Sequence, residues 1–136
     1  MSAIITAKKL VETRLKTISP ALPIAWESAS FNPPADGSKY LRCSFQIGTP
    51  DDSCVGGSYY REKITFNVYV LNKLNIGTVS ALNTAEAIRS LFPKGYSVTE
   101  GSTRVHVLST PRIAGSVVTV DRLVVPISIS LTVESL

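Results

Sequence analysis

A run of strict alternation near the end of the chain constrains the fold more than any other feature. From residue 123 to 133, aliphatic side chains recur at every second position, and Ser128, Ser130 and Thr132 stand between them. Side chains of a β-strand point alternately to opposite faces, so this pattern predicts a long strand with one apolar face. Pro126 lies within the run and has no amide donor, so we expect an edge or a bulge there. The aliphatic positions are Leu123, Val125, Ile127, Ile129, Leu131 and Val133.

Two earlier runs alternate in the same way and predict strands over residues 40–47 and 63–72. The polar stretch between them, residues 48–60, holds three glycines, a proline and adjacent aspartates, and it has no hydrophobic period. We therefore expect a two-stranded ribbon with a long tip, the kind of loop that is usually functional or mobile. The residues expected on the apolar face of this ribbon are Leu41, Cys43, Phe45, Ile47, Ile64, Phe66, Val68 and Val70.

Helical periodicity appears twice. Residues 3–18 and 79–92 carry apolar side chains at steps of three and four, which predicts two amphipathic helices. Pro20 ends the first, because the residue before a proline is pushed out of helical geometry. Thr78 can cap the second, and a Pro-Lys-Gly sequence ends it. The predicted apolar faces are Ile4, Ala7, Val11, Leu15 and Ile18 in the first helix and Leu82, Ala85, Ile88 and Phe92 in the second.

Shorter strands are predicted over residues 24–28, 104–109 and 116–120. The element order is then one helix, three strands, one helix and three strands. Short connections between strands favour a mostly antiparallel sheet, and two helices can cover one of its faces. The sequence thus predicts an α+β fold, a mostly antiparallel sheet with two helices packed on one face, in a single domain spanning residues 1–136.

The composition indicates that part of the protein surface is covered by partner subunits. Hydrophobic residues make up 44% of the 136 residues and charged residues only 18%. No apolar run approaches the roughly 20 residues that span a bilayer, so we expect no membrane partner. The early lysines do not fit a signal peptide, and we expect synthesis in the cytoplasm. Partner subunits are then the expected cover for the surplus apolar surface. The net charge of +4 is scattered along the chain, which signals nucleic-acid binding only weakly.

Residues that carry chemistry are sparse. His106 is the only histidine, and the acidic residues are widely spread. Cys43 and Cys54 lack the paired spacing of a zinc site and read as free thiols. Asp51 and Asp52 are adjacent, whereas the acidic positions of a calcium loop alternate, and the glycine pair before Ser58 precedes no helix that could cradle a phosphate. We therefore expect no catalytic residues, no metal and no cofactor.

Tyr59, Tyr60 and Arg61 close the long loop. Such residues can stack on bases, and they are also enriched at protein interfaces. No second aromatic and basic cluster supports base stacking, so the sequence favours an interface.

The segment after the first helix carries a family resemblance. "LPIAWES" (residues 22–28), then "FNPP" (31–34) and "YLR" (40–42) resemble the tail terminator, or tail completion, proteins of long-tailed bacteriophages. The later strand "ITFNVYV", the helix within "GTVSALNTAEAIRSLFP" and the long last strand are similar too. The resemblance implies structural work in a virion and no enzymatic activity.

Such proteins form a ring, usually hexameric, at the head-proximal end of the tail tube. The ring ends tube polymerisation and joins the tube protein to the head-completion or connector protein, and duplex DNA passes through its lumen. Ring closure needs a heterologous interface, which edge strands or hairpins can supply by pairing across subunits. Transiting DNA should not adhere to the wall, so we expect a lumen that is not strongly basic.

Two segments are candidate partner contacts. Prolines fix backbone dihedrals and remove amide donors, so Phe31, Pro33 and Pro34 suit a rigid contact element that cannot extend the sheet. A simple turn with Phe31 tucked into the core explains the same residues. The second candidate is the long loop and its return, with Asp51, Asp52, Tyr59, Tyr60 and Arg61.

Three other functions remain open from the sequence. A tail tube or connector protein of the same virion would polymerise instead of closing a ring. A small nucleic-acid-binding domain would bind DNA tightly and in a salt-sensitive way. An enzyme would gather His106, an acid and a nucleophile in a cleft.

Overall fold

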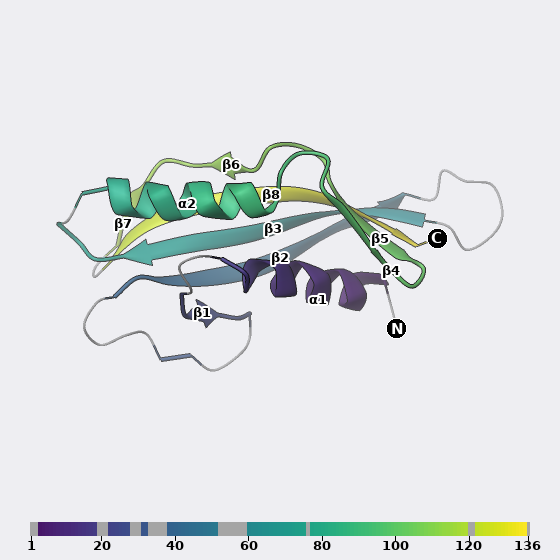
Figure 1. The fold of residues 1–136 in the computed structure, drawn as a ribbon, viewed down its shortest axis with the longest axis horizontal. Helices are drawn as coiled ribbons and strands as arrows, with labels where there is room; N and C mark the ends of the chain where they lie inside the picture. The colour runs from purple at the N-terminus through teal and green to yellow at the C-terminus, as the bar shows by residue number, and fades with distance from the viewer. Residues whose placement is uncertain are drawn as a thin grey trace.

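A computed structural model describes residues 3–18, 22–27, 31–32, 38–51, 60–75, 77–119 and 122–135 (Figure 1). Within these residues it contains two helices and eight strands. The helices are α1 (Ala3–Leu15) and α2 (Val79–Leu91). The strands are β1 (Ile24–Ala25), β2 (Tyr40–Asp51), β3 (Tyr60–Asn72), β4 (Ser97–Glu100), β5 (Thr103–Val107), β6 (Arg112–Ile113), β7 (Val117–Val118) and β8 (Leu123–Ser135).

All strands join one sheet in the order β1-β2-β3-β8-β5-β4, and β6 and β7 pair with β8. The long strands β2, β3 and β8 are antiparallel neighbours. Their register runs from Tyr40 opposite Leu71 to Asp51 opposite Arg61, and β8 follows β3 without a shift. These strands were predicted because one face of each is buried, and this fixes a two-residue period.

Strand β2 continues past its predicted end at residue 47. A register shift between Ile47 and Pro50 carries the pairing on to Asp51. Gly48 makes this possible, because a Cβ at that position would lie 2.7 Å from the Lys63 carbonyl oxygen. The polar stretch that we predicted as loop therefore begins with strand, a common result where a bulge replaces the alternating pattern.

The main core lies between the sheet and the helices. Inward side chains of β8 are buried at every second position, as the alternation predicted, and they pack with those of β3, β2 and β5. Small side chains at Ala7, Ala81 and Ala85 have no exposed surface and let the helices approach closely. Three predicted core residues lie outside it: Leu82 is exposed on α2, Ile47 is 54% exposed on β2, and Ile4 is half-buried on α1 and does not join the core.

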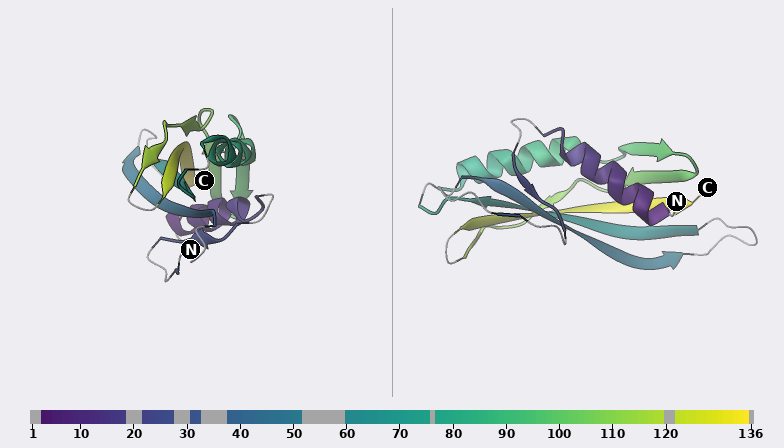
Figure 2. Two further views of the ribbon diagram at one scale, coloured as in Figure 1. Left: turned by 90° about the vertical axis from the view of Figure 1, so that its left-hand side faces the viewer. Right: turned by 90° about the horizontal axis from the view of Figure 1, so that it is seen from below.

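The fold is α+β, but the predicted sheet differs from the observed one in two ways. The sheet is mixed and strand-rich, because β1 runs parallel to β2 and because β4 and β6 join it. It is also curled, so the helices do not rest together on one open face: α1 contacts β5 and β8, whereas α2 contacts β3 and β8 (Figure 2). Twist accumulates along strands of twelve and thirteen residues, which explains the curl.

Pro126 lies in an inner strand, so the expected edge is wrong, whereas the alternative, a bulge, is confirmed: the pairing shifts by one residue between Ile113↔Ile127 and Val117↔Val124. Its carbonyl accepts a hydrogen bond from the amide of Ala114, and its ring nitrogen points to the same side of β8. On that side the ladder is interrupted between β6 and β7. The missing amide donor therefore falls where no ladder bond is required.

Candidate partner-contact site

The two candidate contact segments lie at opposite ends of β2. Phe31 packs beside Tyr40 at the start of the strand, whereas Asp51 and its partner Arg61 lie at the other end. Eleven steps along the strand separate Tyr40 from Asp51, which is roughly 36 Å of extended chain. Among the described residues, the structure thus does not bring the two predicted contact segments together but places them at opposite ends of β2.

Phe31 belongs to a small second cluster on the outer side of the sheet. Its ring stacks on Tyr40 at 5.0 Å between centroids, tilted by 31°. Buried Ala25, Leu71 and Val124 complete the cluster with Tyr40. Phe31 is half-buried, so part of its ring remains accessible. Pro33 and Pro34 lie outside the described residues, and the contact role of all three stays a prediction.

Arg122 supports this cluster. Its side chain is buried, and its guanidinium carbon lies 4.9 Å from the centre of the Tyr40 ring. Arg122 Nη1 donates a 2.6 Å hydrogen bond to the carbonyl oxygen of Ser38. A buried cation is costly unless it is hydrogen-bonded, so these contacts hold the start of β2 against the start of β8. Sequence reasoning missed Arg122, because one arginine beside a turn has no periodic signal.

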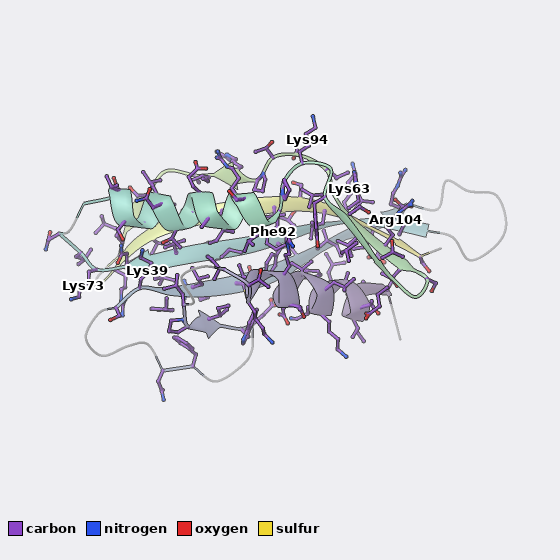
Figure 3. The ribbon with its side chains drawn as sticks, viewed as in Figure 1. Lys39, Lys63, Lys73, Phe92, Lys94 and Arg104 are labelled. Atoms are coloured by element: carbon purple, nitrogen blue, oxygen red, sulfur yellow. The ribbon has the colours of Figure 1, made fainter. Side chains whose placement is uncertain are left out.

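Charged side chains gather at the opposite end. Arg61 is exposed and stands between Asp51 on β2 and Glu134 on β8 in the strand register. Glu134 Oε2 also accepts a 2.7 Å hydrogen bond from Arg104 of β5 (Figure 3). Tyr60 lies opposite Ser135. Asp52 and Tyr59 lie outside the described residues, so the structure places only part of this candidate segment.

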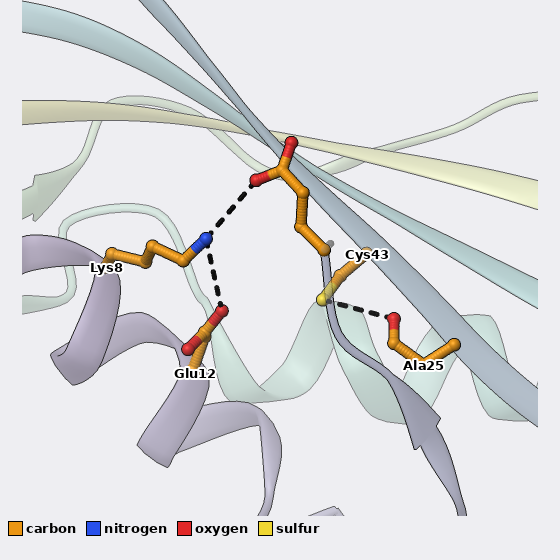
Figure 4. A network of polar contacts seen from close by, with 5 residues as sticks. Lys8, Glu12, Ala25 and Cys43 are labelled. Atoms are coloured by element: carbon orange, nitrogen blue, oxygen red, sulfur yellow. Dashed lines mark hydrogen bonds and ion pairs between the residues drawn. The ribbon is translucent and has the colours of Figure 1, made fainter. Parts of the chain in front are cut away.

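A polar network joins α1 to β1 and β2 (Figure 4). Lys8 Nζ lies 3.2 Å from Glu27 and 3.8 Å from Glu12, and the Cys43 thiol donates a weak 3.9 Å hydrogen bond to the Ala25 carbonyl. Burial raises the pKa of Cys43 from 9.0 to about 11, and the charge of Glu12 adds to this. The thiol is therefore protonated near neutral pH and is a weak nucleophile.

Residues suited to catalysis or metal binding do not converge in the part of the chain that is described. His106 is half-buried on β5, opposite Thr132 of β8 and Ser97 of β4. No group of three histidine, cysteine or carboxylate side chains is placed to hold a metal there. Cys54 lies outside the described ranges. Neither described helix is long and apolar enough to cross a membrane.

A surface hollow of about 510 Å³ lies beside the first half of α2. Lys39 forms part of its wall and donates to Thr84 Oγ1 at 2.8 Å and to the Ser80 carbonyl at 3.2 Å (Figure 3). These bonds tie the segment before β2 to α2. No local sequence pattern predicts this contact, because the partners are 41 and 45 residues apart in the chain.

Exposed aliphatic side chains occur on both helices and on strands β2 and β7. Val79 at the start of α2 is 70% exposed, and Val118 of β7 is 69% exposed. Ile5 of α1 and Ile47 of β2 are about half exposed. Scattered apolar side chains are normal on a surface, but β-branched residues exposed to this extent suit a chain with neighbours.

Comparison with known proteins identifies the class. A family model described as phage tail terminator protein matches residues 6–131. The chain belongs to this family, which makes it a structural component of a phage tail and thus of a virion. The resemblance read from the sequence is therefore confirmed.

A solved structure has a similar fold. It superposes with a TM-score of 0.75 at 29% sequence identity, and the match covers 98% of this chain and 96% of the other. The name of that protein states no function. No curated protein sequence matches significantly.

Proposed function

We propose that this protein forms a ring, hexameric in the simplest form, that caps the head-proximal end of the tail tube. The ring ends tube polymerisation and presents the surface on which the head-completion or connector protein docks. The observation that carries the proposal is the family match, which spans both candidate ends of β2. The work is structural and uses no cofactor or bond-making centre. The ring is made in the host cytoplasm and enters the virion.

The geometry supports contact with two different partners. A capping subunit must touch the tube on one side and the neck on the other. Phe31 and Arg61, the described members of the two candidate segments, lie near opposite ends of β2, whose first and last residues are roughly 36 Å apart. Each can therefore serve one partner without obstructing the other. Duplex DNA passes through the lumen and is not retained.

Tube polymerisation in the presence of the protein tests the proposal. The purified chain is added to polymerising tube protein of the same phage, and tube lengths are measured by electron microscopy. We expect short, uniform tubes with a cap at one end. Mass measurement of the protein alone and on tubes gives the ring size. Open polymers of the chain itself would instead show a tube protein, and tight, salt-sensitive DNA binding would show a nucleic-acid-binding domain.

Matched variants locate the contacts. Replacing Phe31, Pro33 and Pro34 by alanine should abolish capping, and Thr13→Ala, an exposed change on α1, should not. Because Phe31 packs on Tyr40, a thermal melt must first show that the triple variant is folded. Normal capping by the folded triple variant would reject the contact role. Shortening the tip between residues 52 and 59 should leave capping intact and impair head joining.

A further inference from the structure

Two edges of the sheet have unpaired backbone among the described residues. Strand β1 covers the outer edge of β2 only at Leu41 and Arg42, and no described strand pairs with that edge beyond them. Strand β4 is the last strand on the opposite side and pairs only with β5. Figure 2 shows β2 and the β4–β5 hairpin on either side of α1. Unpaired edges of this kind are templates for pairing with another chain.

The observed hydrogen bonds show which backbone amides and carbonyls point toward the free edges. The Leu41 amide donates to Pro23, so Leu41 faces the outer edge of β2, and the period of two directs the amides and carbonyls of Phe45 and Ile47 the same way. On β4, the Tyr96 carbonyl accepts from Val107 of β5. The same period then directs Ser97 and Thr99 away from β5.

The side chains of the two edges match face by face. On the core side, Phe45 and Val98 both pack against the main core, and Ile47 lies exposed beside the free edge. On the outer side, Ser44 and Gln46 of β2 correspond to Ser97 and Thr99 of β4. Joining the edges would place Phe45 beside Val98 on the core side and continue a polar row on the outer side. At the end of the pair, exposed Ile47 would stand beside exposed Glu100, whose methylene groups can cover it.

We propose that β4 of one copy pairs with residues 44–47 of β2 in the next copy. This deepens the ring proposed above and rests on it. The contact is heterologous, so each copy uses both edges and a closed ring leaves neither edge free. Both segments contain four residues, about 13 Å of strand, and the bulge at Gly48 ends the available run on β2.

The direction of pairing is also determined. Each of the steps from β2 to β3, β8, β5 and β4 is antiparallel, so β2 and β4 run the same way. Copies in a ring are related by rotation, and a rotation that continues the sheet with the same face inward preserves strand direction. The new pair is therefore parallel.

Disulfide trapping tests this pairing. In a Cys54→Ser background, Gln46→Cys is combined with Thr99→Cys or, for the neighbouring register, with Ser97→Cys. Strands β3, β8 and β5 separate the two positions within one copy, so a bond between them joins different copies. Diamide oxidation of the rings, formed alone or on tail tubes, should give a ladder of covalent multimers. Each variant with only one introduced cysteine is the control: buried Cys43 is the sole other thiol, so the introduced cysteine can give dimers at most.

A backbone test complements the trapping. Ile47→Pro removes an outward amide while leaving the β2–β3 bonds in place, and Ile47→Thr keeps the amide and the branched shape. We expect Ile47→Pro to weaken assembly by about tenfold per contact relative to Ile47→Thr, with both monomers melting as folded proteins. Equal assembly by the two variants would overturn backbone pairing.

The outcomes separate this inference from the proposed function. Rings on tubes without cross-linked ladders in either register would overturn the edge pairing and leave the capping ring intact. Absence of rings both alone and on tubes would overturn both. If Ile47→Pro fails to fold, the cysteine ladders alone decide the question.

Discussion

Replacing Arg122 by methionine isolates the contribution of one buried cation to the start of β2. Methionine keeps an unbranched stem of similar length and removes the guanidinium. The variant loses the hydrogen bond to the Ser38 carbonyl and the charge above the Tyr40 ring. We expect the free energy of unfolding to fall, with the loss concentrated around the cluster that holds Phe31.

The magnitude follows from the two contacts. A hydrogen bond from a charged donor contributes about 1.5–3 kcal/mol, and a partly desolvated cation above an aromatic ring contributes about 0.5–2 kcal/mol. Ser38 is exposed, so water replaces the lost donor and the lower end applies to that bond. The expected loss is about 2–3 kcal/mol.

Urea denaturation with a double-mutant cycle measures it. Tyr40→Leu is combined with Arg122→Met, and the coupling energy should be about 1 kcal/mol because both changes remove the same ring contact. Arg112→Met, at an exposed arginine on β6, should change stability by no more than about 0.5 kcal/mol. A loss at Arg122 as small as that at Arg112, or a coupling of zero, would refute the reasoning.

Three further predictions concern the sheet and its core. Phe66→Ala should cost about 3–5 kcal/mol in urea denaturation, because the ring is buried between Phe45 and Phe92, and a loss below about 1 kcal/mol would contradict this. Gly48→Ala should cost about 1–3 kcal/mol, since its Cβ would meet the Lys63 carbonyl; an unchanged melt would show that the bulge adapts. In a variant lacking Cys54, a thiol reagent at pH 8 should label Cys43 at least about 100-fold more slowly in the folded than in the unfolded chain. The pKa of the Cys43 thiol is higher in the folded protein than its ordinary value of 9.0. Its contribution to the free energy of unfolding is therefore fully present below pH 9 and is lost as the pH rises through about 11. Cys43→Ala should abolish this pH dependence.

The sequence predicted the elements that bury one face. Strand β8 and both helices have apolar periods that only one secondary structure satisfies, and their positions agree with the structure to within a few residues. Strand β4 was missed because Ser97, Thr99 and Glu100 have no apolar alternation: it is an edge strand whose outer groups face away from the core. The parallel pairing of β1 depends on contacts between distant residues, which no local pattern encodes.

The candidate site was predictable only in composition. The residues that we selected are polar or aromatic and stand beside turns, which is typical of contact segments. Their separation could not be predicted, because it depends on the continuation of β2 through Gly48 to Asp51, which the alternating pattern does not show. Buried Arg122 and half-buried Lys39 could not be found, because a single cation of this kind is recognised only by the oxygen atoms and rings that surround it.

The unbroken register between β3 and β8 has a mechanical consequence. Thirteen residue pairs join these strands side by side along their full length. A force that pulls the two ends of the molecule apart would slide β3 along β8. It would strain all the hydrogen bonds between these two strands at once. Opening them one by one from an end needs much less force, so the subunit resists tension along its strands better than peeling across them.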